Sequence, residues 1–107
     1  MLEQPLLTKL EGLDARYEEL TRLLADPATL ADRDRYQKTA KEHADLAATV
    51  SLYRDFIRVR REAGEAEAMA RDETDPDMRA LAAAEVLRLR QAAASLEKRL
   101  RDALTFE

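Results

Sequence analysis

Apolar residues recur in this chain at alternating steps of four and three positions. The first such run occupies Leu6, Leu10, Leu13, Tyr17, Leu20 and Leu24. Near the other end, the same spacing runs through Ala82, Val86, Leu89, Ala93, Leu96, Leu100 and Ala103. A repeat of 3.5 residues is typical of a helix that packs along its length against another helix. The spacing therefore predicts long helices that bury their apolar stripes against one another.

The middle of the chain, from about Asp32 to Arg71, contains no proline and carries two adjacent apolar seams. One seam is formed by Leu46, Val50, Tyr53 and Ile57, and the other by Leu52, Phe56, Val59, Ala63, Ala66 and Ala70. Two seams on one helix imply two neighbours. At the rise of an α-helix, about 40 residues make a rod of roughly 60 Å, so we expect an elongated molecule.

Two Asp-Pro steps divide the chain into three helices. Pro27 disfavours the α conformation at Asp26, so the first helix is expected to end near Ala25. At the second joint, Asp75 is the expected N-cap and Pro76 the first helical residue. The expected helices cover about 6–25, 32–71 and 76–104. The predicted fold is a single all-α domain over residues 1–107, an elongated, antiparallel, coiled-coil-like three-helix bundle with a long central helix.

The first joint contains the tripeptide Pro27-Ala28-Thr29. Thr29 and Asp32 fit the Ser/Thr-x-x-acid pattern that begins a helix, and Asp32 itself is the alternative cap. The tripeptide is therefore interpreted as part of a turn between two helices.

Composition narrows the class of protein and its compartment. Apolar residues make up 46% of the chain and aromatic residues only 5%, and cysteine is absent. The 18 basic and 22 acidic residues leave a net charge of −4, so there is no global basic field to attract nucleic acid or an anionic membrane. The lack of cysteine fits a reducing compartment, and no apolar run approaches the length of a membrane span. A cytoplasmic protein that does not enter a membrane is expected.

Few residues suggest catalytic chemistry. His43, the single histidine, stands in helical register three residues before Leu46, and a packed structural role is favoured over an acid-base role. Glu42, His43 and Asp45 point in diverging directions on a helix and make a weak metal site. Met69 and Met78 flank the second joint and are interpreted as core filler. We expect no enzyme activity, no catalytic residue, no metal and no cofactor.

The most basic stretch of the chain is YRDFIRVRR, residues 53–61. Its arginines Arg54, Arg58 and Arg61 share one helical face and are the candidate contacts to RNA phosphates or the ribosome. The alternative is a solvated face whose charge is balanced by Asp55, Glu62 and Glu65. This alternative is favoured, because no aromatic residues interleave with the arginines.

Three ordered motifs carry a family resemblance. They are LLADPATLADRDRY at residues 23–36, KEHADL at 41–46 and DPDMRALAAAE at 75–85. Together they resemble the N-terminal helical domain of bacterial peptide chain release factor 1, a class-I translation release factor, over about residues 6–104.

The resemblance implies that the chain lacks the reactive parts of such a factor. Full-length factors release the peptide through a Gly-Gly-Gln loop and read the stop codon through a Pro-x-Thr tripeptide, both in later domains. This chain contains no Gly-Gly pair, and Pro27-Ala28-Thr29 lies between helices, so neither role is carried over. The chain is expected to be an isolated domain, either excised or the product of a truncated gene.

What the resemblance implies instead is docking in translation termination. The expected partner is the ribosome, at the stalk-base region of the large subunit, with an effect on recycling by the release-factor GTPase. The methyltransferase that modifies the release-loop glutamine is a further implied partner, and no small-molecule substrate is expected. The alternative, from the seams themselves, is an autonomous helical adaptor or a homodimer.

Overall fold

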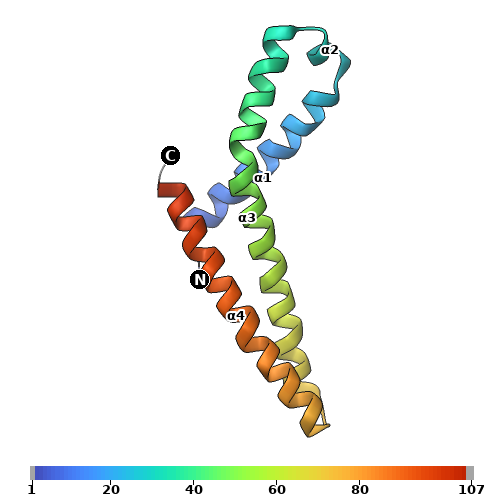
Figure 1. The fold of residues 1–107 in the computed structure, drawn as a ribbon, viewed down its shortest axis with the longest axis vertical. Coiled ribbons are helices and arrows are strands. Elements are labelled where there is room, and N and C mark those ends of the chain that lie inside the picture. Colours follow the sequence, from blue (N-terminus) through green and yellow to red (C-terminus); the bar gives the residue numbers. More distant parts are fainter. Residues whose placement is uncertain (1, 106–107) are drawn as a thin grey trace. The chain divides into compact units, whose positions relative to one another are not determined.

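The computed structural model describes residues 2–105, and every regular element in that range is an α-helix (Figure 1). The helices are α1 (Gln4–Ala25), α2 (Pro27–Leu30), α3 (Arg33–Asp72) and α4 (Pro76–Thr105). The predicted all-α fold with a long central helix is confirmed. The bounds predicted for the three long helices lie within two residues of those observed.

The first joint contains a helix that the sequence did not predict. Helix α1 ends at Ala25, as expected, but Pro27 begins the single turn of α2. The Asp26 carboxylate Oδ1 accepts a hydrogen bond from the backbone N–H of Ala28 at 2.9 Å. Asp26 therefore caps α2, because its side chain satisfies a donor that the short helix leaves unpaired.

Asp32, and not Thr29, caps the long helix α3. The Asp32 carboxylate accepts from the backbone N–H of Arg35 at 3.1 Å, and its carbonyl accepts from that of Tyr36 at 2.9 Å. Thr29 lies within α2, where only 1% of it is exposed. Of the two caps that the sequence left open, Thr29 is wrong and Asp32 is correct.

The second joint has the predicted arrangement. Helix α4 begins at Pro76, and the carboxylate of Asp75 accepts from the backbone N–H of Asp77 at 2.9 Å. Glu73, two residues before Asp75, also stabilises the turn. Its Oε1 accepts hydrogen bonds from the backbone N–H groups of both Thr74 and Asp75, each at 3.0 Å. The turn is therefore closed by carboxylate side chains that satisfy the backbone donors.

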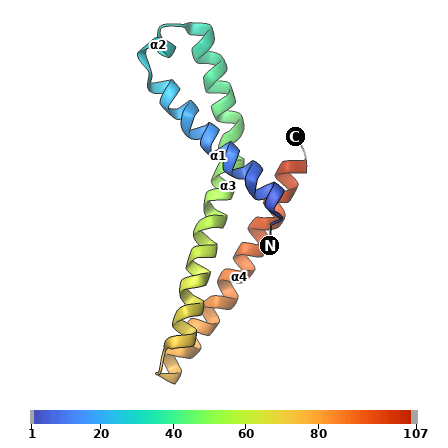
Figure 2. The ribbon, with the colours of Figure 1, turned by 180° about the vertical axis from the view of Figure 1, so that it is seen from behind.

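The helices form two compact units, residues 2–53 and residues 54–105. In the first unit, α1 and the first part of α3 run side by side in opposite directions and are joined through α2 (Figures 1 and 2). Buried residues of this unit include Leu10, Leu20 and Val50, all of which belong to predicted seams. The four-three pattern therefore identified the packed face of α1.

In the second unit, the remainder of α3 pairs with α4 around a small core. Val59, Ala63 and Leu89 form its buried centre. Around them pack the partly buried residues Ala66, Ala92, Ala93 and Leu96. Alanine at so many contact positions allows two helix backbones to approach closely. Both helices use the faces predicted from the sequence.

Three apolar residues depart from their expected burial. Ile57, assigned to the first seam of α3, is 41% exposed, because it lies beyond the first unit and off the Val59–Ala63 face that packs in the second. Met69 and Met78 are 54% and 46% exposed. Their interpretation as core filler is wrong, because alanines already fill the narrow space between α3 and α4.

Candidate functional site

The predicted arginine stripe lies on α3 in the second unit, and acidic side chains of the same helix pair with two of its arginines. Arg58 forms ion pairs with Asp55 at 3.4 Å and with Glu62 at 3.5 Å. Arg61 lies 3.9 Å from Glu65. Arg54 also has an interaction partner. The acids that pair with Arg58 and Arg61 are those that the alternative interpretation named.

These ion pairs are weak enough to be exchanged for other contacts. The side chains of Arg58 and Arg61 are 52% and 67% exposed, and the pairs are long. Exposed pairs of this kind contribute roughly 0.2–1 kcal/mol each. A phosphate group could therefore replace the carboxylates at small cost in free energy, so these arginines can still bind an anion.

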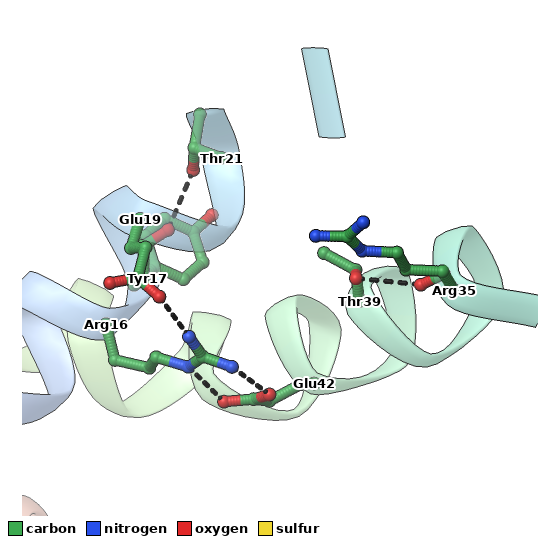
Figure 3. A network of polar contacts seen from close by, with 7 residues as sticks. All are labelled: Arg16, Tyr17, Glu19, Thr21, Arg35, Thr39 and Glu42. Carbon is green, nitrogen blue, oxygen red and sulfur yellow. Dashed lines mark hydrogen bonds and ion pairs between the residues drawn. The ribbon is translucent and has the colours of Figure 1, made fainter. Parts of the chain in front are cut away.

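A second polar cluster links α1 to α3 within the first unit (Figure 3). The guanidinium of Arg16 donates to both carboxylate oxygens of Glu42, at 2.7 and 2.8 Å, and also pairs with Glu19 on its own helix. This two-pronged geometry is the strongest that an arginine and a carboxylate form. Hydrogen bonding to Arg16 lowers the pKa of Glu42, and the same bond raises the pKa of Arg16. The contact fastens the two helices together.

His43 lies one residue further along α3 and packs against α1. Its ring stacks on that of Tyr17, with the centroids 4.1 Å apart and the planes 17° from parallel. The Thr21 hydroxyl donates to the Tyr17 carbonyl at 3.0 Å and lies 2.9 Å from His43 Nε2, within hydrogen-bond distance. The ring thus joins the two helices by its face and by one nitrogen. This geometry supports the structural role that the sequence favoured.

A groove at the turn end of the α3–α4 pair was not anticipated from the sequence. It has a volume of about 400 Å³ and is lined by Met69, Met78 and Leu81, with acidic side chains at its edges. Leu81 is 65% exposed. The sequence did contain an indication of this groove, because Leu81 stands outside the four-three register of Ala82, Val86 and Leu89. Large apolar residues that miss the buried register must point to solvent.

Among residues 2–105, no group of three or more histidine or acidic side chains is arranged to hold a metal ion. None of the described helices combines the length and apolar character that crossing a bilayer requires.

Comparison with known proteins assigns the family. Residues 13–107 match the PCRF domain, so the chain belongs to the PCRF domain family. The match extends from within α1 to the end of the chain.

The curated relatives are named for one factor. The chain is 41% identical over 96 residues to peptide chain release factor 1 of Desulforudis audaxviator, covering 90% of the chain and 27% of that relative. It is 40% identical over 101 residues to the same factor of an Anaeromyxobacter species, covering 94% of the chain and 27% of the relative. For the factor of Bacillus anthracis, identity is 35% over 96 residues, with 90% and 27% covered. No solved structure matches the chain.

These relatives confirm the resemblance to the N-terminal domain of peptide chain release factor 1 that the three sequence motifs suggested. The chain spans about a quarter of the length of the curated relatives that it matches, 27% in each of the three.

Proposed function

We propose that this chain is the non-catalytic N-terminal domain of a peptide chain release factor and acts in translation termination in the cytoplasm. One observation carries the proposal: residues 13–107 match the PCRF domain, and release factor 1 relatives align over nine-tenths of the chain. A helical domain without a convergent set of reactive side chains among its described residues suits a role in docking.

The proposed docking site is the stalk-base region of the large ribosomal subunit. From there the domain would affect recycling by the release-factor GTPase, and it would also be available to the methyltransferase that modifies the release-loop glutamine. Arg54, Arg58 and Arg61 are the proposed contacts to ribosomal RNA, because all three residues are exposed and the long ion pairs of Arg58 and Arg61 can exchange carboxylates for phosphates.

The experiment uses a release factor 1 relative on ribosomes halted at a stop codon. Three forms are compared: the intact factor, the factor lacking the segment that matches this chain, and the factor with residues 1–107 of this chain in that place. We expect the deletion to slow GTPase-dependent recycling more than peptide release at saturating factor. The chimaera should recover recycling, and the isolated chain should release no peptide.

Two results would overturn this proposal. Loss of peptide release at saturating factor in the deleted form would assign the segment a part in hydrolysis. A chimaera that folds and releases peptide but recycles no better than the deleted form would show that this chain lacks the docking role.

A further inference from the structure

The end of the first unit where α1 and α3 are joined is held by a single buried side chain. Of residues 25–38, Thr29 is buried and every other residue is exposed. Thr29 belongs to α2, the short helix at this end of the hairpin (Figure 1). By contrast, α1 buries two leucines, Leu10 and Leu20, which are 1% and 0% exposed. Helix α2 is therefore attached to the unit more weakly than the helices that it joins.

The one buried residue of α2 is polar, and its hydroxyl lacks a hydrogen bond. Thr29 is 1% exposed, and no atom of residues 2–105 forms a hydrogen bond with its Oγ1. A hydroxyl that loses water on burial without gaining a protein partner opposes the packing of its own side chain. The next residue, Leu30, is apolar but 55% exposed. Burial in α2 is thus the reverse of that expected for a packed helix, so it stabilises this turn little.

The hydrogen bonds that shape α2 are all local. The backbone N–H of Leu30 donates to the carbonyl of Asp26 at 3.1 Å, and that of Ala31 donates to the carbonyl of Pro27 at 3.0 Å. Bonds of this kind do not maintain an isolated single turn in water, because too few of them offset the cost of ordering the backbone. The turn therefore unwinds when Thr29 leaves its buried position, and the amides of Leu30 and Ala31 report that event.

We propose that α2 is a conformational element that opens by itself while α1 and α3 stay folded. In the closed state, Thr29 buries its methyl group and leaves its hydroxyl unpaired. In the open state, water hydrates the hydroxyl, which offsets the loss of the small apolar contact and keeps the open state close in free energy. The end of the hairpin can then change shape for a partner without unfolding either long helix. The proposal concerns the first unit alone and holds whether or not the domain docks on the ribosome.

Amide hydrogen exchange of the 1–107 chain, followed by NMR at several low urea concentrations, tests the opening. We expect the amides of Leu30 and Ala31 to be protected at least about tenfold less than that of Val50, which is 2% exposed in α3. Their exchange should change little with urea, because a local opening exposes little surface. The Val50 amide should exchange faster as urea is added, because it requires the unit to unfold.

Substitutions at Thr29 test whether its hydroxyl controls the opening. Thr29→Val has nearly the same shape without the hydroxyl, and it should slow exchange of the Ala31 amide about tenfold. Thr29→Ser keeps the hydroxyl but loses the methyl group, and it should make this exchange faster. Leu30→Gln, at the adjacent exposed position, is the matched control and should leave the exchange of Ala31 unchanged. Circular dichroism checks that each variant keeps the helical content of the parent.

Three results would overturn the proposal. If Leu30 and Ala31 showed the protection and urea dependence of Val50, α2 would open only with the whole unit. If Thr29→Val made exchange of the Ala31 amide faster, the hydroxyl would be satisfied by an internal water molecule and would hold α2 closed. If Thr29→Val and Leu30→Gln both left the exchange unchanged, Thr29 would have no control over this end of the hairpin.

Discussion

At the scale of single residues, a few side chains fix how α1 meets α3. Arg16 reaches across to Glu42 with two hydrogen bonds, and Tyr17 stacks on His43. Two consecutive residues of α1 thus contact two consecutive residues of α3. Such specific contacts fix the register of the two helices, which apolar stripes alone allow to slide.

The Arg16–Glu42 pair makes the stability of the chain depend on pH. Hydrogen bonding to Arg16 lowers the pKa of Glu42 from its usual value of 4.5. The stabilisation is therefore complete above the unfolded-state pKa and is lost as pH falls through the lower folded-state pKa. We expect Glu42→Gln to lower the urea midpoint at about pH 7 and to make much less difference at about pH 3.

Asp45→Asn is the matched control for this prediction. Asp45 pairs with Lys41 at 2.9 Å on the same helix, so its loss breaks no link between helices. Its effect on the urea midpoint should be smaller than that of Glu42→Gln. A deficit in Glu42→Gln that stayed constant from neutral to acid pH would mean that the carboxylate acts through packing and not through its charge.

At the scale of elements, α3 serves two partners with different faces. Its first part packs on α1, and its second part packs on α4 through Val59 and Ala63. The arginine stripe occupies an exposed face of that second part, where its charge is balanced within the helix. Intrahelical balance stabilises the helix by tenths of a kcal/mol per pair and leaves the face open to a stronger anion.

The stripe predicts a salt-dependent contact with ribosomal RNA. The triple change of Arg54, Arg58 and Arg61 to Glu should weaken binding of the domain to ribosomes. Because each lost phosphate contact removes about 0.7–0.9 from the slope of log K against log salt, the slope should fall by roughly two to three. Affinity measured over a series of salt concentrations checks both effects.

A control separates the stripe from general charge. Reversing three other exposed basic residues, Lys38, Lys98 and Arg99, changes the net charge equally and should affect binding much less. The triple Gln variant of the stripe tests loss of contact without added repulsion. If all three variants bound ribosomes as the parent does, the stripe would be a solvated face only.

At the scale of the whole molecule, α3 is continuous from Arg33 to Asp72 and so passes through both units without a break. We infer that residues 1–107 form a single folding domain. The chain should show one calorimetric transition, with equal calorimetric and van't Hoff enthalpies. Two separate transitions in the parent protein would contradict the inference.

A break in α3 should uncouple the two units. Ser51→Pro places a proline in the helix interior near the boundary, which costs about 3 kcal/mol or more. We expect this variant to unfold in two steps or at a markedly lower temperature. Ser51→Ala, at the same exposed position, should keep the single transition.

The spacing of apolar residues and the two Asp-Pro steps were enough to determine the helices. Both signals are local, because helical periodicity and proline geometry depend on residues a few positions apart. The sequence also carried the motifs that placed the chain in its family, and the acids that would neutralise Arg58 and Arg61. These pairs lie three or four residues apart on one helix, so their geometry follows from the helix itself.

Only the tertiary structure decided which apolar residues stay exposed and which polar residues link helices. Met69 and Met78 look like core residues until the alanine-lined contact between α3 and α4 leaves no room for them. Glu42 is an ordinary surface acid until the hairpin brings it to Arg16, 26 positions away. Both outcomes depend on how closely and in which register two helices meet. That is settled by long-range packing, which no short stretch of sequence encodes.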